Sequence, residues 1–179
     1  MPKNRFLDKS FLDKSKARGL RLLCHRAAPT PFGSALLLAT AEGEIAFLGF
    51  CGQARAKREI SALRKNWSLA AIEEQPDKLA KLAKAAFSAT PPPLLLIGTP
   101  FQHKVWRALL RIKPGTTTSY GALAEKLNTA PRALGGAVGA NPVSWLVPCH
   151  RVLDGKGGLN GYRWGLGVKR QLLQAEGAA

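Results

Sequence analysis

The first half of the chain alternates between short apolar runs and turn-forming residues. Three runs rich in Leu, Ala, Ile and Phe have the length of strands, and they cover residues 20–26, 34–40 and 44–50. Pro29-Thr-Pro31 and Glu42-Gly43 separate these runs and are typical of turns. Consecutive short strands joined by tight turns predict a small antiparallel sheet.

Helical spacing follows the third run. Residues 54–65 and a second segment that opens at Pro76 each place their apolar side chains on one face. These positions are Ala56, Ile60 and Leu63 in the first segment, and Leu79, Leu82, Ala83 and Ala86 in the second. The runs and helices together predict a small α+β module over residues 19–89.

Three successive prolines mark a boundary in the chain. Prolines in series hold an extended path and cannot continue a helix, so residues 90–98 are predicted to be a connector, with a brief apolar strand at residues 94–97. Thr99-Pro100 is a favourable helix start, and residues 101–112 follow it with one apolar face. We expect residues 99–179 to form a mostly α-helical second domain.

Two short helices are predicted between residues 119 and 140. Ser119 caps the first helix, and a polar turn over residues 128–131 leads into the second, which is a helix-turn-helix pattern. The second helix is rich in glycine, although each interior glycine costs about 1 kcal/mol relative to alanine. Either it packs closely on a neighbouring element, or it is slim because it enters a narrow groove of nucleic acid.

The N-terminal residues 1–18 contain a tandem repeat, Phe6-Leu-Asp-Lys-Ser10 and Phe11-Leu-Asp-Lys-Ser15. One duplicated pentapeptide among basic residues does not define a repeat fold. We expect a basic, flexible arm that either adds nonspecific phosphate contacts or has no function.

Net charge narrows the class of partner. The chain has 27 Lys and Arg against 11 Asp and Glu, a net charge of +16 and a pI near 10.4. This excess is larger than solubility requires, and it favours nucleic acid as the partner over an anionic membrane or an acidic protein.

Composition also excludes several classes of protein. The hydrophobic content of 46% suits a buried core, and no apolar run is long enough to cross a bilayer. Three cysteines without disulfide spacing, and an N-terminus without an apolar leader, predict a cytoplasmic protein. No spacing of metal ligands is present, so we expect neither a metal nor a cofactor.

The candidate chemistry lies in residues 141–152, Asn-Pro-Val-Ser-Trp-Leu-Val-Pro-Cys-His-Arg-Val. The apolar run at residues 143–147 predicts a short buried strand that Pro148 ends, so Cys149 stands at a strand end. The neighbouring His150 and Arg151 predict a cationic setting that favours a thiolate.

The alternative for any free cysteine is an inert place in the core. That is our interpretation of Cys24, which lies in an apolar run with no turn or proline to present it. For Cys149 the residues alone leave both readings open.

Pro148-Cys-His-Arg-Val152, with Asn141-Pro142 before it and Gly161-Tyr-Arg-Trp-Gly165 after it, resembles the O6-alkylguanine-DNA alkyltransferases, also called methylated-DNA–protein-cysteine methyltransferases. The resemblance is good over residues 99–177 and weaker over residues 20–87. It implies a DNA-repair protein that moves an alkyl group from O6-alkylguanine, and from O4-alkylthymine, to Cys149 in a single turnover without a cofactor. It also implies a monomer that binds alkylated double-stranded DNA through the minor groove, in the cytoplasm or, in a bacterium, on the nucleoid.

The resemblance assigns the DNA contacts to the helix-turn-helix. Arg132 matches the finger arginine that fills the hole left by the extruded nucleotide. Tyr120 matches the tyrosine that helps to rotate the phosphate and donates a proton toward the departing guanine. The other expected contacts are Ala133, Gly135, Gly136 and Arg151. The turn between Tyr120 and Arg132 is shorter than in several relatives, which leaves the pose of Arg132 open.

Glu176 is the predicted partner of His150. It lies four residues after Leu172 and three after Leu173, on the apolar face of the last predicted helix. A buried carboxylate needs a partner, whereas a solvent-facing residue near the end of the chain would not. By resemblance, Cys149 is the nucleophile, His150 is its base through a water, Glu176 orients the imidazole, and Asn141 supports the turn.

The substrate pocket is also assigned by resemblance, to Val152, Tyr162, Arg163 and Trp164. The backbone at Val152 is expected to read the guanine, and the bulk of Arg163 and Trp164 predicts a narrow pocket that prefers methyl to benzyl groups. A different class stays open: a non-catalytic helix-turn-helix protein that binds DNA or senses alkyl lesions, with a structural Cys149.

Overall fold

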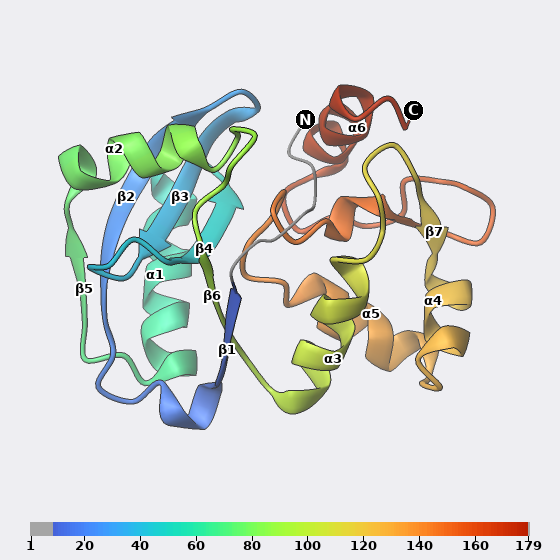
Figure 1. The fold of residues 1–179 in the computed structure, drawn as a ribbon, viewed down its shortest axis with the longest axis horizontal. Helices are drawn as coiled ribbons and strands as arrows, with labels where there is room; N and C mark the ends of the chain where they lie inside the picture. Colours follow the sequence, from blue (N-terminus) through green and yellow to red (C-terminus); the bar gives the residue numbers. More distant parts are fainter. Residues whose placement is uncertain (1–8, 179) are drawn as a thin grey trace.

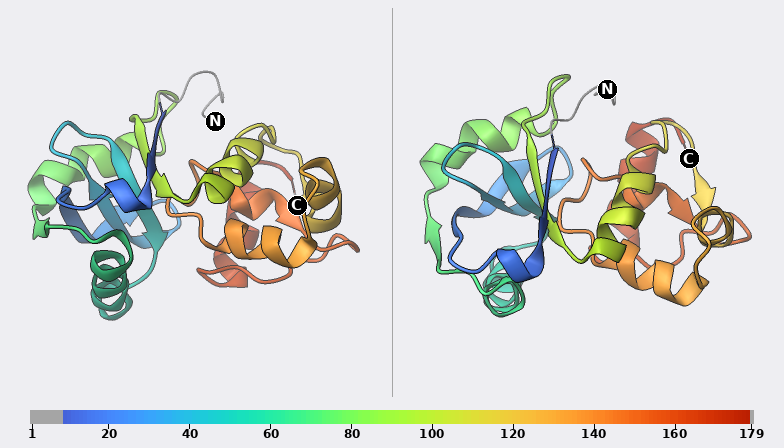
Figure 2. Two further views of the ribbon diagram at one scale, coloured as in Figure 1. Left: turned by 90° about the horizontal axis from the view of Figure 1, so that it is seen from below. Right: turned by 60° about the horizontal axis from the view of Figure 1, so that its bottom comes forward.

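The computed structural model describes residues 9–178, which form two modules that lie side by side (Figure 1, Figure 2). The first module contains a six-stranded sheet in the order β1-β6-β4-β3-β2-β5. Its strands are β1 (Lys9–Asp13), β2 (Arg21–Thr30), β3 (Gly33–Ala39), β4 (Ile45–Phe50), β5 (Ala71–Glu74) and β6 (Leu94–Gly98). The predicted antiparallel pairing of β2, β3 and β4 is confirmed, and so is the predicted α+β class of fold.

Two helices complete the first module. They are α1 (Gln53–Trp67) and α2 (Pro76–Ala85), which begins at Pro76 as predicted. Each buries its apolar face, through Leu63 and Trp67 in α1 and through Leu79 and Ala83 in α2. All residues of β4 and β6 are buried, so these strands form the centre of the core.

Residues 9–16 differ from the flexible arm that we expected. Residues 9–13 are β1, which pairs in parallel with β6 over five residue pairs, and η1 (Lys14–Lys16) follows with Asp13 as its cap. The Phe11 ring lies 5.2 Å from the His103 ring and 4.0 Å from the Arg107 guanidinium. The free edge of β6 supplies the backbone partners that a short repeated sequence does not reveal. The rest of the predicted arm up to residue 8 lies outside the described residues.

The second module is mostly helical. It contains α3 (Pro100–Leu109), α4 (Tyr120–Lys126), α5 (Pro131–Gly139) and α6 (Leu166–Ala175), with the 3-10 turn η2 (Cys149–Arg151) and a short parallel pair, β7 (Thr118–Ser119) and β8 (Val152–Leu153). The two predicted helix starts are confirmed, because Thr99 forms a capping box with Gln102 and Ser119 accepts a hydrogen bond from the Ala122 amide. The buried Trp106 Nε1 donates to the Ala137 oxygen at 2.9 Å and so joins α3 to α5.

Residues 143–147 are buried as predicted, but the prediction of a strand is wrong. They form turns, and their one pairing is an isolated bridge between Val143 and Leu48 of β4. The Leu48 amide donates to the Pro142 oxygen, and the Ser144 amide donates to the Leu48 oxygen, both at 2.9 Å. A continuous apolar run indicates burial and not a particular backbone path. The segment is therefore a loop docked on the sheet of the first module.

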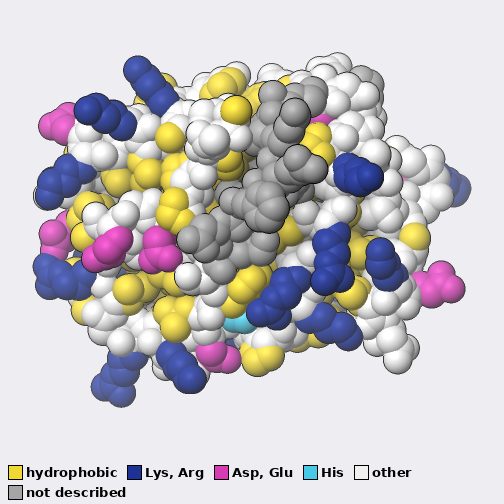
Figure 3. Space-filling view, viewed as in Figure 1, with side chains coloured by type: hydrophobic (Ala, Val, Ile, Leu, Met, Phe, Trp, Pro, Cys, Tyr) yellow, Lys and Arg dark blue, Asp and Glu magenta, His cyan; other side chains and the backbone are white. Residues whose placement is uncertain are grey.

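The surface reflects the excess of positive charge. On the face shown in Figure 3, Lys and Arg side chains outnumber acidic ones and gather over α3. Among residues 9–178, no helix is both long and apolar enough to span a membrane.

Candidate active site

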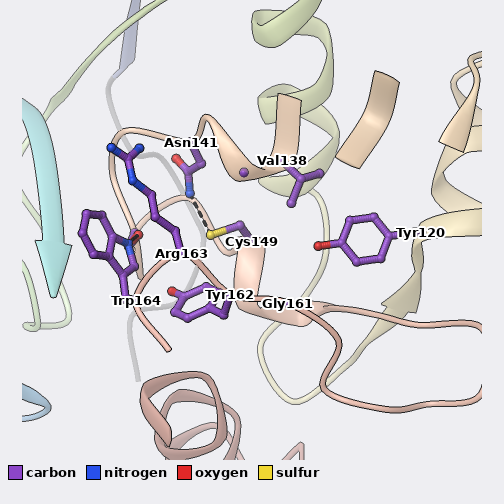
Figure 4. Close-up of a pocket in the computed structure, with 10 residues that line it drawn as sticks. Tyr120, Val138, Asn141, Cys149, Gly161, Tyr162, Arg163 and Trp164 are labelled. Atoms are coloured by element: carbon purple, nitrogen blue, oxygen red, sulfur yellow. Dashed lines mark hydrogen bonds between the residues drawn. The ribbon is translucent and has the colours of Figure 1, made fainter. Parts of the chain in front are cut away.

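An open pocket beside α5 contains the sulfur of Cys149 (Figure 4). Its walls come from four segments of the second module. The lining residues are Tyr120, Val138, Gly139, Asn141, Ser144, Cys149, Gly161, Tyr162, Arg163 and Trp164. The Tyr120 hydroxyl points across the pocket toward Cys149. The fold therefore brings Cys149, Asn141, Tyr120 and the loop after Gly161 together, as predicted.

Asn141 organises the loop that carries the cysteine. Its Nδ2 donates to the Val147 oxygen at 2.8 Å and to Cys149 Sγ at 3.1 Å, and its Oδ1 accepts from the Val143 amide at 3.1 Å. Asn141 is 2% exposed, so these bonds form away from water. One side chain therefore shapes the turn and places a donor on the sulfur.

The electrostatic setting of Cys149 differs from the cationic one that we expected. Burial raises the pKa of the Cys149 thiol, and the hydrogen bond from Asn141 and the charge of Lys169 only partly oppose this effect. The pKa of Cys24 is raised to about 11, mainly by burial, as suits the core position predicted for it. Cys149 is therefore a thiol at rest, and its reaction requires a group that takes the proton.

His150, the residue after Cys149, is the group that we predicted for this role. It is fully buried, and its Nε2 lies 3.2 Å from Glu176 Oε1, at an angle short of a well-aligned hydrogen bond. Burial lowers the pKa of His150 more than Glu176 raises it, so the imidazole is neutral at pH 7. With its proton on Nε2 toward Glu176, the ring keeps Nδ1 as an acceptor.

Glu176 is on the buried face of the last helix, as predicted, but it has a second partner. Arg151 donates to it through Nε at 2.8 Å and Nη2 at 2.5 Å, and its Nη1 donates to the Ile112 oxygen. Burial alone would raise the pKa of Glu176, yet the contacts with Arg151 and His150 outweigh it and lower the pKa to about 2. Glu176 is therefore a carboxylate that faces His150.

Two predicted contact residues have partners inside the protein. Arg151 is 5% exposed and its guanidinium is engaged with Glu176, so it does not reach DNA. Val152 is fully buried and lies outside the pocket lining, and its oxygen accepts a hydrogen bond from Lys169 at 2.7 Å. Arg151 is the last residue of the 3-10 turn η2 and Val152 is its C-cap, and both side chains are buried.

The first module reaches the pocket wall through α1. Arg163 Nη2 donates to Glu59 Oε2 at 2.5 Å, and Arg55 Nη2 donates to the Arg163 oxygen at 2.7 Å. Both guanidinium groups lie over the Trp164 ring, at 4.8 Å and 4.9 Å from its centroid. Trp164 Nε1 donates to Ser144 Oγ at 2.6 Å. Arg163 and Trp164 thus line the pocket as predicted, and no sequence pattern pointed to Arg55 or Glu59.

The glycines of α5 lie on an open surface. Apart from the neighbouring residues and the backbone of α5 itself, a methyl group added at Gly135, Gly136 or Gly139 would meet no described atom within 4 Å. Close packing against another element of residues 9–178 therefore does not explain these glycines. Arg132 and Ala133 are exposed in the first turn of the same helix, so the outer surface of α5 is slim and carries one cation.

Lys169 was missed by the sequence reasoning. It is fully buried in α6, and its Nζ donates to the oxygens of Val152 and Asn160. Burial lowers the pKa of Lys169, while its charge lowers the pKa of Cys149. Its spacing of three from Leu172 is the signal that identified Glu176, and it could have found Lys169 as well.

The described residues contain no group of three or more His, Cys, Asp or Glu side chains that could hold a metal ion. The pocket lining includes the thiol of Cys149 and the phenols of Tyr120 and Tyr162, and the imidazole of His150 is buried next to Cys149 in the chain.

Comparison with known proteins defines the class. Residues 100–178 match the family model of the 6-O-methylguanine DNA methyltransferase DNA-binding domain. A methylated-DNA–protein-cysteine methyltransferase of Candida albicans is 48% identical over 83 residues, which are 46% of this chain and 47% of that one. Another, of Mycobacterium tuberculosis, is 49% identical over 83 residues, 45% of this chain and 50% of that one. The match thus spans about half the length of these curated relatives.

Solved structures extend the likeness to both modules. The crystal structure of Mycobacterium tuberculosis OGT in complex with DNA is 30% identical, has a TM-score of 0.65, and covers 89% of this chain and 94% of that one. The O6-methylguanine-DNA methyltransferase of Pyrococcus kodakaraensis is 27% identical, with a TM-score of 0.59 and coverage of 88% and 98%. The chain belongs to the methylated-DNA–protein-cysteine methyltransferase family.

Proposed function

We propose that this protein repairs DNA by transferring an alkyl group from O6-alkylguanine, and from O4-alkylthymine, to Cys149 in one turnover. The observation that carries this proposal is the position of Cys149 Sγ. It lies in an open pocket, with an amide donor at 3.1 Å and a neutral imidazole on the next residue, beside the slim surface of α5. A structural cysteine needs none of these neighbours.

The transfer is a displacement at the alkyl carbon. His150 takes the thiol proton, through a water as the family resemblance implies, and Glu176 stabilises the imidazolium that forms. The Sγ–C bond forms as the C–O6 bond breaks. The electron pair of the broken C–O6 bond passes to the guanine ring. Tyr120 donates a hydrogen bond or proton toward the departing base. Because the product is a thioether, which has no acyl carbon for water to attack, the protein is not regenerated.

Binding is proposed to use the minor groove. A base must leave the duplex before its O6 substituent can reach a side chain in a pocket. The outer surface of α5 has the small residues Ala133, Gly135 and Gly136, which support entry into a narrow groove. We assign to Arg132, exposed in the first turn of α5, the role of filling the vacated stack. Alkylated double-stranded DNA is thus the partner, bound by a monomer in the cytoplasm, or on the nucleoid in a bacterium.

One incubation tests the proposal. The protein is mixed with a short duplex that carries labelled O6-methylguanine, and the mass of the intact protein and of its peptides is measured. We expect one methyl group per chain on Cys149, none in Cys149→Ser, and normal uptake in Cys24→Ser, which alters another buried cysteine. Repeated turnover, or tight binding of the lesion without transfer, would contradict the proposal, and the second result would indicate a lesion sensor.

A further inference from the structure

Trp145 has an unusual conformation in the loop that precedes Cys149. Its φ of 72° lies in the left-handed region, and its buried indole Nε1 has no hydrogen-bond partner among the described residues. Among residues 9–178, the other non-glycine residues with positive φ are Ser68 and Asn128, small polar residues that follow α1 and α4. A bulky aromatic residue in this region is strained, and such strain persists only where the surroundings impose it.

The surroundings of Trp145 are an aromatic cluster that crosses between the modules. Its ring is nearly parallel to that of His150, with centroids 5.9 Å apart and planes 13° apart. It also contacts Phe87 at 5.9 Å and 28°, and Phe32 at 5.3 Å and 46°. Phe50 packs on both of these phenylalanines. The indole therefore packs on phenylalanines of the first module and stacks, with an offset, against the imidazole of His150.

Few polar contacts fix the orientation of the His150 ring. Its one close polar contact in the described chain is the 3.2 Å approach of Nε2 to Glu176, and neither ring nitrogen forms a well-aligned hydrogen bond. A ring with a single polar contact can rotate about it, and rotation changes where Nδ1 points. Offset stacking against an aromatic face restricts that rotation.

We propose that Trp145 is a positioning residue that holds the imidazole of His150 in the plane needed to take the thiol proton of Cys149. The first module, through Phe87 and Phe32, thereby acts on the transfer step. This inference rests on the proposed function of the site. It predicts an effect on the rate of transfer and not on the affinity for DNA.

The test compares variants with a matched control. Trp145→Leu removes the stacked ring, Trp145→Phe keeps an aromatic face, and Trp67→Leu removes another buried indole that is 7% exposed and lies at the end of α1. The single-turnover rate of methyl transfer at saturating duplex, and the Kd for an unmethylated duplex, are measured for each. We expect Trp145→Leu to be slower by about tenfold to a hundredfold, as for small misplacements of catalytic groups, with an unchanged Kd. Trp145→Phe should recover most of the rate, and Trp67→Leu should match wild type.

A second measurement does not depend on activity. The His150 ring protons are followed by NMR as a function of pH in the free protein, where Glu176, Arg151 and Lys169 are the charged groups that influence the ring. A changed titration or chemical shift in Trp145→Leu, absent in Trp67→Leu, supports the inference even if wild type takes up no methyl group and the proposed function fails.

Wild-type rate together with a wild-type titration in Trp145→Leu would overturn the inference. If that variant does not fold, Phe87→Leu, which removes the ring behind the indole, is measured in its place. A normal rate in Phe87→Leu would overturn the role given to the first module.

Discussion

Replacing Glu176 by glutamine removes one buried charge and nearly preserves the shape of the side chain. Burial opposes ionisation of Glu176, but contacts with Arg151 and His150 prevail and lower its pKa to about 2, from an ordinary value of 4.5. The two pKa values differ by about 2.5, and a difference of one in pKa corresponds to about 1.36 kcal/mol. The ionised form of Glu176 is therefore stabilised in the folded protein by roughly 3 kcal/mol. We therefore expect Glu176→Gln to lower the free energy of unfolding by about 3 kcal/mol at pH 7, as when one partner of a buried ion pair is lost.

The pH dependence gives the sharper test. Because the pKa of Glu176 is lower in the folded than in the unfolded state, its stabilisation is present above pH 4.5 and is lost as the pH falls toward 2. The difference between wild type and Glu176→Gln should thus shrink in acid, to roughly half of its neutral value near pH 3. Glutamine also cannot stabilise the imidazolium, so methyl transfer should slow at pH 7.

The assay is urea unfolding followed by tryptophan fluorescence at several pH values. Glu125→Gln serves as the matched control, because Glu125 is exposed on α4 and forms none of these contacts. A difference below about 1 kcal/mol at pH 7, the size of an exposed ion pair, would refute the reasoning, as would a difference that does not depend on pH.

Three further substitutions test other contacts. Asn141→Ala removes the donor to Cys149 Sγ and two bonds that shape the loop, so we expect methyl transfer at least about tenfold slower and, from unfolding curves, a loss of about 1–3 kcal/mol. Trp164→Gly should speed transfer of benzyl relative to methyl groups, and equal slowing of both in single-turnover assays would count against a narrow pocket. Gly98→Ala would put a methyl group 2.5 Å from the Trp106 ring, so thermal unfolding should show a loss of about 1–3 kcal/mol; an unchanged Tm would mean that the ring moves freely.

The sequence predicted what depends on local chemistry. Thr99 and Ser119 cap helices because their side chains accept backbone hydrogen bonds wherever a helix follows. The three strand runs pair as expected because consecutive apolar strands lie next to each other. The spacing from Leu172 and Leu173 to Glu176 identified a buried carboxylate because an α-helix repeats its faces at fixed intervals.

Only the tertiary structure decided which way the same residues face and what they meet. The basic Arg151 is buried because η2 turns it toward Glu176, and the apolar run before Cys149 forms turns because Asn141 and β4 hold its backbone. Trp145 stacks on His150 and also contacts Phe87 of the first module. Residue type and spacing specify a local conformation, but burial, the pKa of Cys149 and the open surface of α5 depend on chain segments distant in sequence, and packing alone brings these together.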